Sequence, residues 1–460
     1  MHIATLEEQR KQIIQKQPEV ILAGACRIGE GIIGLEESEV KRLAKVLTNS
    51  QVKKTLFVPA SGSGSRMFEF LFDFVSNPSE SNRGQVERFL NHIEDFAFFY
   101  QFPNEIQQQL RDRTMDIESF VAYILNNKGF GLAHLPKGLV PFHKHGPFLL
   151  NPFHEHVLQG LRMSKDMQFH FTIRPNFMDI IRKQLAYLEG MTSQQIAVSF
   201  SEQDPESDAF AFDDSGNEVR LENGALLRRP SGHGALLQNL ENVHSDLLFI
   251  KNIDNVQHFS QSASSVTTMQ MLGGLLLELQ QKIREILLTP SADKIATLNQ
   301  HYQLFHPDEL TRPLEELVAL LDRPLRVCGM VRNEGQPGGG PFWVQEKSGV
   351  SKQIVEKAQI DMRGEQYRVM IQSTHFNPVV MVCEGKRADG TPIDFDRYKD
   401  PSKYFIVHKN HQGQAIQFVE LPGLWNGSMA HWNTVFVEIP STAFSPVKTI
   451  LDLLDPAHLD

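Results

Sequence analysis

The chain has 460 residues, of which 41% are hydrophobic and 22% charged, ordinary values for a globular protein with a sizeable core. Its formal net charge of −10 disfavours broad nucleic-acid binding, which needs a basic face, but leaves room for a local basic pocket for phosphates. Three widely spaced cysteines, a polar start without a secretion signal and the absence of any run of about 18 apolar residues predict a cytoplasmic protein with no membrane span.

The first third of the chain predicts helices, one buried strand and a helical insertion. Helices are expected at about residues 5–17 and 37–49, and the apolar run at 55–60 predicts a strand that ends in the loop SGSGSR. Residues 77–128 carry apolar side chains at three- and four-residue spacing, which predicts helices that form an insertion or cap. The segment 136–148 is rich in Pro, Gly, Lys and His and predicts a loop.

Beyond residue 167, strands and helices alternate. We expect strands at 167–174, 196–203 and 246–254, a hairpin turn at 213–217, and helices at 175–190, 234–242, 266–288 and 292–304. Further strands are expected near 325–331, 366–372, 378–384, 404–408, 415–420 and 433–439, followed by a closing helix at 445–454. This alternation predicts an α/β protein with parallel strands. We expect three consecutive parts: helices at 1–53, an α/β core at 54–320 and a mixed α+β part at 321–460.

The loop after the first predicted strand has the composition of an anion site. In the stretch VPASGSGSRM, successive backbone N–H groups precede a helix, and Gly62 and Gly64 would let a ligand approach the backbone. Arg66 adds a forked positive charge that suits phosphate. The stretch lacks the Gly-Lys-Ser/Thr ending of a Walker loop, and an ordinary surface loop remains the alternative.

Two further residues have a chemical and a structural interpretation. Lys137, between Pro136 and Gly138, is either a solvated charge or a point charge for a ligand phosphate. Asp254 follows the strand predicted at 246–254, where the carboxyl ends of parallel strands bind ligands. It could hold Mg²⁺, a hard cation that prefers carboxylate and phosphate oxygens, or it could simply belong to a turn.

Four motifs occur in an order that resembles a known group of enzymes. AxGxGxRM at 60–67, PKG at 136–138, PxGHGALL at 230–237 and NIDN at 252–255 resemble the sugar-1-phosphate nucleotidyltransferases, most closely the UDP-sugar pyrophosphorylases. Segments 327–335 and 429–454, the latter with a Pro-Val-Lys triplet, add to the resemblance. It covers residues 54–454 in short islands and suggests a bacterial branch of that group.

This resemblance implies a fold, a reaction and a cofactor. The fold would be a Rossmann-like α/β sheet of the GT-A type, with the helical insertion and an α+β C-terminal portion. The enzyme would join a nucleoside triphosphate, UTP being favoured, to a sugar 1-phosphate and release pyrophosphate. The sugar phosphate would attack the α-phosphorus in line, with Mg²⁺ bridging the phosphates, so that catalysis would be positioning and charge neutralisation.

The resemblance also implies roles for individual residues. Asp254 would hold Mg²⁺, Lys137 would neutralise phosphate charge, Lys448 would meet the sugar phosphate, and Arg66 would contact the departing pyrophosphate. The nucleotide would be bound by Ala60, Ser61, Gly62, Ser63, Gly64, Ser65, Gly232, His233 and Gly234, and the sugar by His375, Asn377 and Asn433.

The sequence departs from the family pattern in two places. Ser61 stands where the family has glycine, and Lys137 lies 71 positions beyond Arg66, so the intervening helices must fold out as a cap. A nucleotide-sugar-binding or glycosyltransferase-like protein, or a non-catalytic nucleotide sensor, therefore remains an alternative.

The glycines 338–340 predict either a moving flap or a wide turn. His143, His145, His154 and His156 lack the further ligands of a zinc site and are expected to be surface or core residues.

Overall fold

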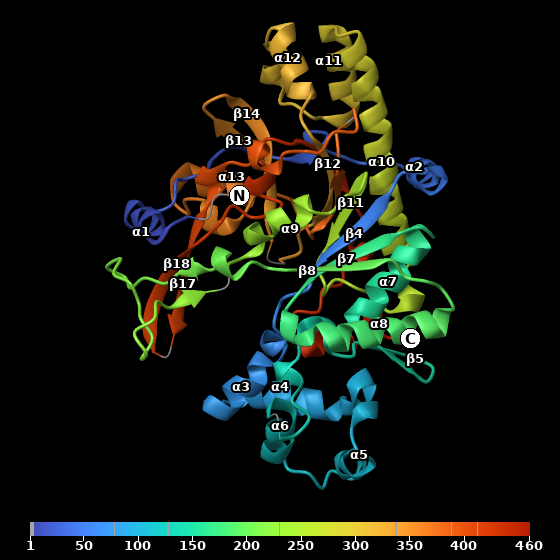
Figure 1. Cartoon of the computed structure of the whole chain (residues 1–460), viewed down its shortest axis with the longest axis vertical. Helices are drawn as coiled ribbons and strands as arrows, with labels where there is room; N and C mark the ends of the chain where they lie inside the picture. Colours follow the sequence, from blue (N-terminus) through green and yellow to red (C-terminus); the bar gives the residue numbers. More distant parts are fainter. Residues whose placement is uncertain are drawn as a thin grey trace. The chain divides into compact units, whose positions relative to one another are not determined.

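The chain forms two compact units whose sequence stretches interleave (Figure 1). The computed structural model describes residues 4–77, 79–126, 128–229, 231–335, 338–387, 389–411 and 413–460. The first unit comprises Met1–Thr55, Gln203–Ile250 and Met269–Ile439, and the second comprises Leu56–Glu202, Lys251–Thr268 and Pro440–Asp460. This division differs from the three consecutive parts expected, because sequence patterns report local structure and not which distant stretches pack together.

The main sheet of the first unit is mostly parallel and buried. Its strands run in the order β2 (Arg27–Ile28), β3 (Gly31–Ile33), β19 (Asn433–Glu438), β12 (Leu325–Arg332), β16 (Val380–Glu384) and β11 (Leu247–Lys251). β12 pairs in parallel with β19, β19 in parallel with β3, and β12 antiparallel with β16. A short strand, β15 (His375–Phe376), also pairs with β12. Strands buried on both faces read as continuous apolar runs, which explains why most of them were predictable.

Smaller elements complete the first unit. A three-stranded antiparallel sheet consists of β1 (Ile21–Ala25), β13 (Gly340–Glu346) and β14 (Gly349–Val355). Two hairpin-like pairs join β9 (Ala209–Phe210) with β10 (Arg228–Arg229), and β17 (Phe405–His411) with β18 (Gln414–Glu420). The helices here are α1 (Leu6–Gln15), α2 (Glu37–Asn49), α9 (Leu237–Glu241), α11 (Ala292–Tyr302), α12 (Leu314–Leu321), α13 (Gly364–Ile371) and most of α10 (Ala263–Leu288).

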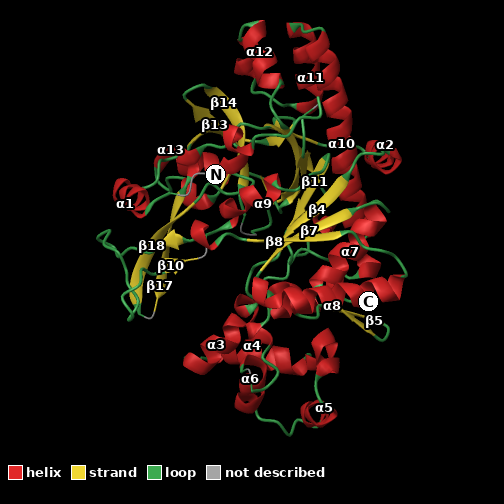
Figure 2. Cartoon of the chain, viewed as in Figure 1, coloured by secondary structure: helices red, strands yellow, loops and turns green. Residues whose placement is uncertain are grey.

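The second unit contains strands β4, β7 and β8, which Figure 2 shows in yellow beside helices α7 and α8. β4 (Lys54–Pro59) neighbours β7 (Gln168–Ile173), which pairs in parallel with β8 (Val198–Glu202). Helices α7 (Pro152–Met163) and α8 (Met178–Thr192) follow β6 (Phe148–Leu150) and β7, and β6 forms a hairpin with β5 (His143–His145). The strand–helix–strand alternation expected from the sequence is therefore present.

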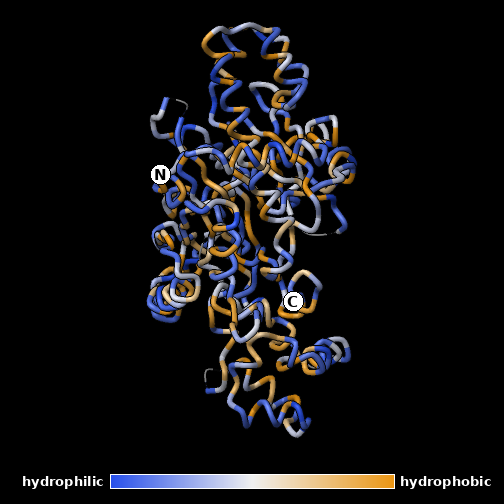
Figure 3. Tube along the Cα trace, turned by 90° about the vertical axis from the view of Figure 1, so that its right-hand side faces the viewer, coloured by the Kyte–Doolittle hydropathy of each residue, from blue (hydrophilic) through white to orange (hydrophobic). Residues whose placement is uncertain are grey.

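The expected insertion is helical and has a core of its own. It contains α4 (Glu80–Asn91), α5 (Asn104–Arg111) and α6 (Ile117–Leu125), and α3 (Glu69–Ser76) precedes it directly. Phe89 lies at the centre of a phenylalanine cluster and contacts Phe70, Phe96, Phe98 and Phe120. Aromatic pairs at such distances add about 0.5–1.5 kcal/mol each beyond the burial of their area. In Figure 3, apolar and polar stretches alternate along these helices, as expected for elements that bury one face.

Three local expectations need correction. Residues 366–372 were expected to form a strand, but they belong mostly to helix α13. The closing helix expected at 445–454 is reduced to a 3₁₀ turn, Ile450–Leu454, which Thr449 and Asp452 begin with a capping box. The hairpin of β13 and β14 was not foreseen. Within the described part of the chain, no helix combines the length and the apolar composition needed to cross a membrane.

Candidate functional site

The Ser/Gly loop and the Pro-Lys-Gly loop lie against each other in the second unit. The N–H of Gly64 donates to the carbonyl of Leu135 at 3.0 Å, and the N–H of Lys137 donates to the carbonyl of Gly62 at 3.2 Å. These two bonds form a single antiparallel bridge between Ser63 and Pro136. A Cβ on Gly64 would lie 2.7 Å from the Leu135 carbonyl oxygen, so only glycine fits there. The insertion thus leaves Lys137 beside the loop despite the long separation in sequence.

Part of the loop remains available to an anion. Ala60 donates its N–H to the Thr172 carbonyl, and Ser65 donates its N–H to Ser63 Oγ at 3.2 Å. The N–H groups of residues 61–63 take part in none of the hydrogen bonds between described residues. A Cβ on Gly62 would meet nothing within 4 Å, so a ligand has space beside this glycine. Arg66 is exposed on the short 3₁₀ turn Ser65–Phe68 that follows.

Asp254 joins two lysines from distant parts of the second unit. Its Oδ2 atom lies 2.8 Å from Lys137 Nζ and 2.9 Å from Lys448 Nζ. The NIDN motif also holds the Pro-Val-Lys segment through the backbone, because Val447 N–H donates to the Asp254 carbonyl at 3.0 Å. Asn255 adds a bridge to Pro446 in the same segment. The NIDN motif and the Pro-Val-Lys segment are therefore one local structure.

The three charged side chains of this group differ in how far they are exposed to solvent. The side chains of Asp254, Lys137 and Lys448 are 9%, 14% and 55% exposed, respectively. Burial would raise the pKa of Asp254, but the attraction and hydrogen bonds of the two ammonium groups outweigh it and lower the pKa. Burial lowers the pKa of Lys137, although Asp254 opposes the change. The ion group itself has two positive charges and one negative charge, and Asp452 supplies a second negative charge nearby.

The group can accommodate a magnesium ion through one carboxylate oxygen. Asp254 Oδ1 is buried and has no hydrogen-bond partner among the described residues. Asp452, the other nearby carboxylate, is occupied, since its Oδ2 accepts the N–H groups of Lys448 and Thr449. Mg²⁺ commonly binds through one or two carboxylates and takes its other ligands from phosphates and water. Asp254 therefore fits a single-carboxylate site, and the metal assignment stays a prediction.

The Gly-His-Gly motif packs against a second segment of the first unit. His233 stacks on Trp425 with ring centroids 3.9 Å apart, and its Nδ1 accepts the N–H of Leu424 at 2.7 Å. Burial lowers the pKa of His233 to about 4, so the ring is neutral. A Cβ on Gly232 would lie 2.1 Å from Glu420 Oε2, and a Cβ on Gly234 would lie 2.3 Å from the Pro422 carbonyl oxygen. The chain itself thus makes the close approach that was expected of a nucleotide.

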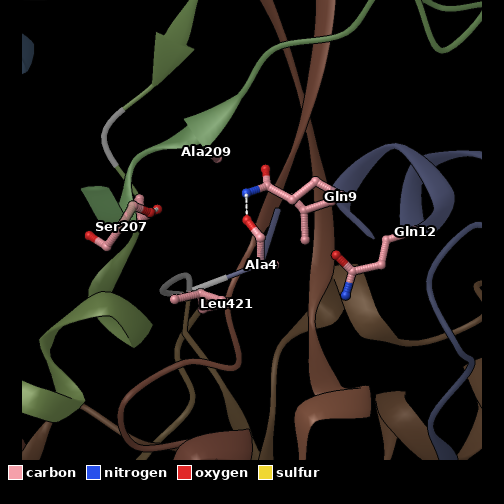
Figure 4. A pocket seen from close by; sticks show the side chains of 8 residues that line it. Ala4, Gln9, Gln12, Ser207, Ala209 and Leu421 are labelled. Atoms are coloured by element: carbon pink, nitrogen blue, oxygen red, sulfur yellow. Dashed lines mark hydrogen bonds between the residues drawn. The ribbon is translucent and has the colours of Figure 1, made fainter. Parts of the chain in front are cut away.

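Two cavities of very different size adjoin this motif. Ser231 lines a space of about 10 Å³ together with Gln9 and Gln12, where Gln9 Nε2 donates to the Ala4 carbonyl (Figure 4). That space holds about one water molecule. A cavity of about 390 Å³ is lined by Gly234, by α1 and by the loops around Tyr404 and Pro422. Only the second reaches the size of small-molecule sites, about 300–1,000 Å³.

The residues expected to bind a sugar are used within the protein. Asn377 donates to the Gly329 carbonyl at 3.0 Å, and Asn433 donates to the Leu321 carbonyl at 3.0 Å. His375 bonds to Thr374 Oγ1 through Nδ1, and its Nε2 lies 3.4 Å from Glu438. All three side chains are buried, and they satisfy polar groups near the ends of strands. The structure does not gather them around one cavity, and their sugar role stays a prediction.

The glycines 338–340 form neither a free flap nor a wide turn. Gly340 begins strand β13. A Cβ on Gly338 would lie 2.9 Å from Phe376, and a Cβ on Gly339 would lie 2.6 Å from Ile354, so both glycines are packed against neighbours. Residues 336–337 of this segment lie outside the described residues.

One of the histidines after Lys137, His143, belongs to a buried relay of hydrogen bonds that the sequence does not reveal. His143 Nδ1 lies 2.7 Å from Glu155 Oε1, and His143 Nε2 lies 2.9 Å from His458 Nδ1. Burial raises the pKa of Glu155 to about 8 and lowers those of His143 and His458 to about 3. The three side chains are buried, so a neutral chain of hydrogen bonds ties α7 to the C-terminal segment.

His154 and His156 are also buried, whereas His145 is exposed, as expected for core and surface residues. Ligand atoms of His145, His258 and Asp460 do lie within 4.8 Å of one another. Both ring nitrogens of His258, however, already bond to Ser260 and to the Lys144 carbonyl. This grouping therefore does not offer a free set of metal ligands.

These features define a mixed α/β protein with a positively charged loop site. The chain belongs to the family described as "Domain of unknown function (DUF4301)", whose model matches residues 1–459. No curated protein matches the chain.

Solved structures similar to the chain include three from eukaryotic parasites. A protein assigned as a UDP-N-acetylglucosamine pyrophosphorylase from Entamoeba histolytica is 12% identical, with a TM-score of 0.47 over 90% of this chain and 80% of that chain. A variant of UDP-glucose pyrophosphorylase from Leishmania major in complex with UDP-glucose is 12% identical, with a TM-score of 0.44 over 97% and 73%. A UDP-glucose phosphorylase from Trypanosoma brucei is 11% identical, with a TM-score of 0.44 over 95% and 69%.

Proposed function

We propose that the second unit binds the phosphates of a nucleoside triphosphate and that the protein is a GT-A-type nucleotidyltransferase of the cytoplasm. It would join the nucleotide, UTP being favoured, to a sugar 1-phosphate and release pyrophosphate. The observation that carries this proposal is the placement of Lys137 and Lys448 on one oxygen of Asp254, with Lys137 hydrogen-bonded through its backbone to the Ser/Gly loop. The preference for uridine rests on the resemblance of the four motifs.

The charge balance of the group suits an incoming phosphate. Asp254 pairs with both ammonium groups and Asp452 adds a second carboxylate nearby, so the two lysines, the exposed Arg66 and the loop N–H groups are what a phosphate would meet. A phosphate could draw Lys448 from Asp254 at small cost, because that side chain is more than half exposed. Lys137 is largely enclosed and would contribute a fixed charge. Fixed charges in an enclosed site stabilise developing negative charge without reorganising.

The proposed reaction needs these charges but no covalent intermediate. A phosphate oxygen of the sugar 1-phosphate forms a bond to the α-phosphorus, while the bond to the bridging oxygen of pyrophosphate breaks and its electrons leave with pyrophosphate. The nucleophile is already an anion, so no proton has to be removed. Residues 60–66 would cradle the triphosphate, with Arg66 on the departing pyrophosphate, while Lys137 would neutralise phosphate charge and Lys448 would meet the sugar phosphate.

The remaining roles follow from the chemistry of the donors. Asp254 Oδ1 would hold Mg²⁺, which when bound would neutralise and orient the phosphates. Gly232, His233 and Gly234 are proposed nucleotide contacts, and the cavity beside Gly234 is large enough for a small molecule. His375, Asn377 and Asn433 are proposed sugar contacts that would have to exchange their present hydrogen bonds.

A pyrophosphate-release screen tests the function. The purified full chain with Mg²⁺ is assayed with each common nucleoside triphosphate against glucose, galactose and N-acetylglucosamine 1-phosphates. Lys137→Met and Lys448→Met should each lower kcat by roughly 100-fold, as for the loss of one charge-stabilising donor. Lys357→Met serves as the control, because this lysine is exposed in the first unit.

If no pair of substrates leads to release of pyrophosphate, the proposed nucleotidyltransferase activity is refuted. A nucleotide-sugar-binding protein or a nucleotide sensor would instead show ligand-induced stabilisation without turnover. Thermal melting with each nucleotide and nucleotide sugar separates these outcomes.

A further inference from the structure

A second charged cavity lies in the first unit and uses none of the residues assigned above to the phosphate site. Its volume is about 70 Å³, several times the roughly 10–15 Å³ that one water requires. The charged side chains that line it come from the turn Pro307–Thr311 with Arg312, from the start of β12, and from β13 and β14. They are Glu309, Arg312, Arg323, Glu346 and Lys352.

The two carboxylates at this cavity are already engaged. Glu309 binds Arg312 through Oε2 at 2.7 Å and accepts the N–H of Val350 through Oε1 at 2.8 Å. Glu346 accepts a hydrogen bond from Ser351 Oγ at 3.1 Å and pairs with Lys403 Nζ at 3.5 Å. Glu346 Oε1 has no hydrogen-bond partner among the described residues, and both carboxylates attract Arg323, so the three cations and two carboxylates of the lining leave one unbalanced positive charge.

Three residues that line the cavity carry N–H groups that could donate further hydrogen bonds. Lys352 is buried, donates to the Gly31 carbonyl at 3.0 Å and lies over the rings of Trp343 and Phe436, but no carboxylate among the described residues pairs with it. The Arg323 guanidinium is partly buried and forms none of the hydrogen bonds between described side chains. The indole N–H of Trp432, which is buried at the start of β19, has no acceptor in the described chain. Lysine, arginine and indole groups donate but do not accept, so only an acceptor can satisfy them.

Burial disfavours the charged forms of these two cations and so lowers their pKa values. Burial lowers the pKa of Lys352 to about 8 and lowers the pKa of Arg323. Buried charges are normally paired, and an unpaired buried donor costs free energy that a bound acceptor would recover. Water could accept hydrogen bonds here, but it would not compensate the charge.

We propose that this cavity binds a small oxyanion, held by Arg323, Lys352 and the indole N–H of Trp432. The volume limits the ligand to a few heavy atoms, such as orthophosphate, sulfate or a short carboxylate. The three proposed donors are not among the residues assigned to the nucleotidyltransferase function, although Asn433, a proposed sugar contact, also lines the cavity.

Equilibrium dialysis of the full chain with radiolabelled orthophosphate tests the proposal. The Lys137→Met/Lys448→Met variant is used as the background, which removes the proposed triphosphate site. We expect saturable binding there with an affinity like that of the unaltered chain, competed by sulfate or by a short carboxylate but not by chloride at equal ionic strength. The competitors identify which oxyanion the cavity prefers.

Two variants and a matched control locate the binding. Arg323→Gln should weaken phosphate binding by about tenfold or more, and Trp432→Phe by several-fold, because each removes one donor. Arg368→Gln is the control, since this arginine is exposed on α13 and should leave the affinity unchanged. Melting without phosphate confirms that each variant is folded. Absence of saturable binding in the background variant, or equal affinity in both site variants, would overturn the proposal.

Discussion

The ion group at Asp254 predicts a specific loss of stability when its negative charge is removed. Asp254→Asn keeps the size of the side chain but leaves two ammonium groups, 2.8 Å and 2.9 Å from the same oxygen position, within about 6 Å of each other. Two unit charges at that distance repel by about 3 kcal/mol at an effective dielectric constant of 20. Lys448 is half exposed and can turn toward solvent, which reduces the penalty. We therefore expect the free energy of unfolding to fall by about 2–3 kcal/mol.

Urea unfolding of the variant and of a matched control measures this loss. Asp322 forms an ion pair with Arg387 at 2.8 Å, a similar distance, but its side chain is 56% exposed. Exposed pairs contribute about 0–1 kcal/mol, so Asp322→Asn should change stability by less than about 1 kcal/mol. Equal effects of Asp254→Asn and Asp322→Asn would refute the electrostatic reasoning.

Two further measurements follow from the same charges. Since the variant has two uncompensated lysines, pyrophosphate should raise its melting midpoint more than that of the unaltered chain. The folded pKa of Asp254 is lowered, so its stabilising contribution is present above the unfolded pKa of about 3.9 and is lost as pH falls toward the folded value. The stability difference between the two proteins should therefore stay constant between about pH 5 and 8 and shrink below about pH 4. A difference that is undiminished at pH 3 would contradict this assignment.

Three more substitutions separate packing from ligand binding and test the buried relay. Gly234→Ala should destabilise the chain by about 2 kcal/mol or more in urea unfolding, because its Cβ would collide with the Pro422 backbone. Gly62→Ala should fold normally but lose affinity for phosphates in a binding assay, because its Cβ would occupy open space beside the loop. For Glu155, the folded pKa of about 8 exceeds the unfolded value of about 4.3, so its stabilising contribution is lost as pH rises through that window. Glu155→Gln should thus gain about 1–3 kcal/mol relative to the unaltered chain between pH 5 and pH 9, and parallel pH profiles would contradict it.

The elements that could be read from the sequence are those whose local pattern matches their burial. β4 and β11 are buried along nearly their whole length, and both were expected from apolar runs. Residues 366–372 were misjudged because their Val-Met-Ile run favours a strand, while α13 leaves much of its surface exposed and contacts β1 through Gln366. β13 and β14 were missed although their connection, Lys347–Ser348, is followed directly by Gly349 with a φ of 131°, so the Ser-Gly pair was a turn signal that the interpretation overlooked.

The candidate site was only partly accessible to sequence reasoning. The motifs identified Lys137, Asp254 and Lys448 as separate candidates, but nothing local predicts that one oxygen of Asp254 holds both lysines. That contact depends on the backbone bonds between the Pro-Val-Lys segment and the NIDN motif, which are almost 200 positions apart. The role of Asp452 in fixing Lys448 was likewise invisible, because it acts through backbone N–H groups.

The glycines of the motifs show where a ligand has room. A glycine in a motif indicates that something approaches the backbone closely, but the sequence does not say what. At Gly64, Gly232 and Gly234, the neighbour is the protein itself, at 2.1 to 2.7 Å from a hypothetical Cβ. At Gly62, nothing lies within 4 Å, although this residue is bonded through its carbonyl to the lysine loop. A ligand therefore has room to approach the backbone at Gly62, next to Lys137. The Gly-His-Gly motif, by contrast, packs one segment of the first unit against another.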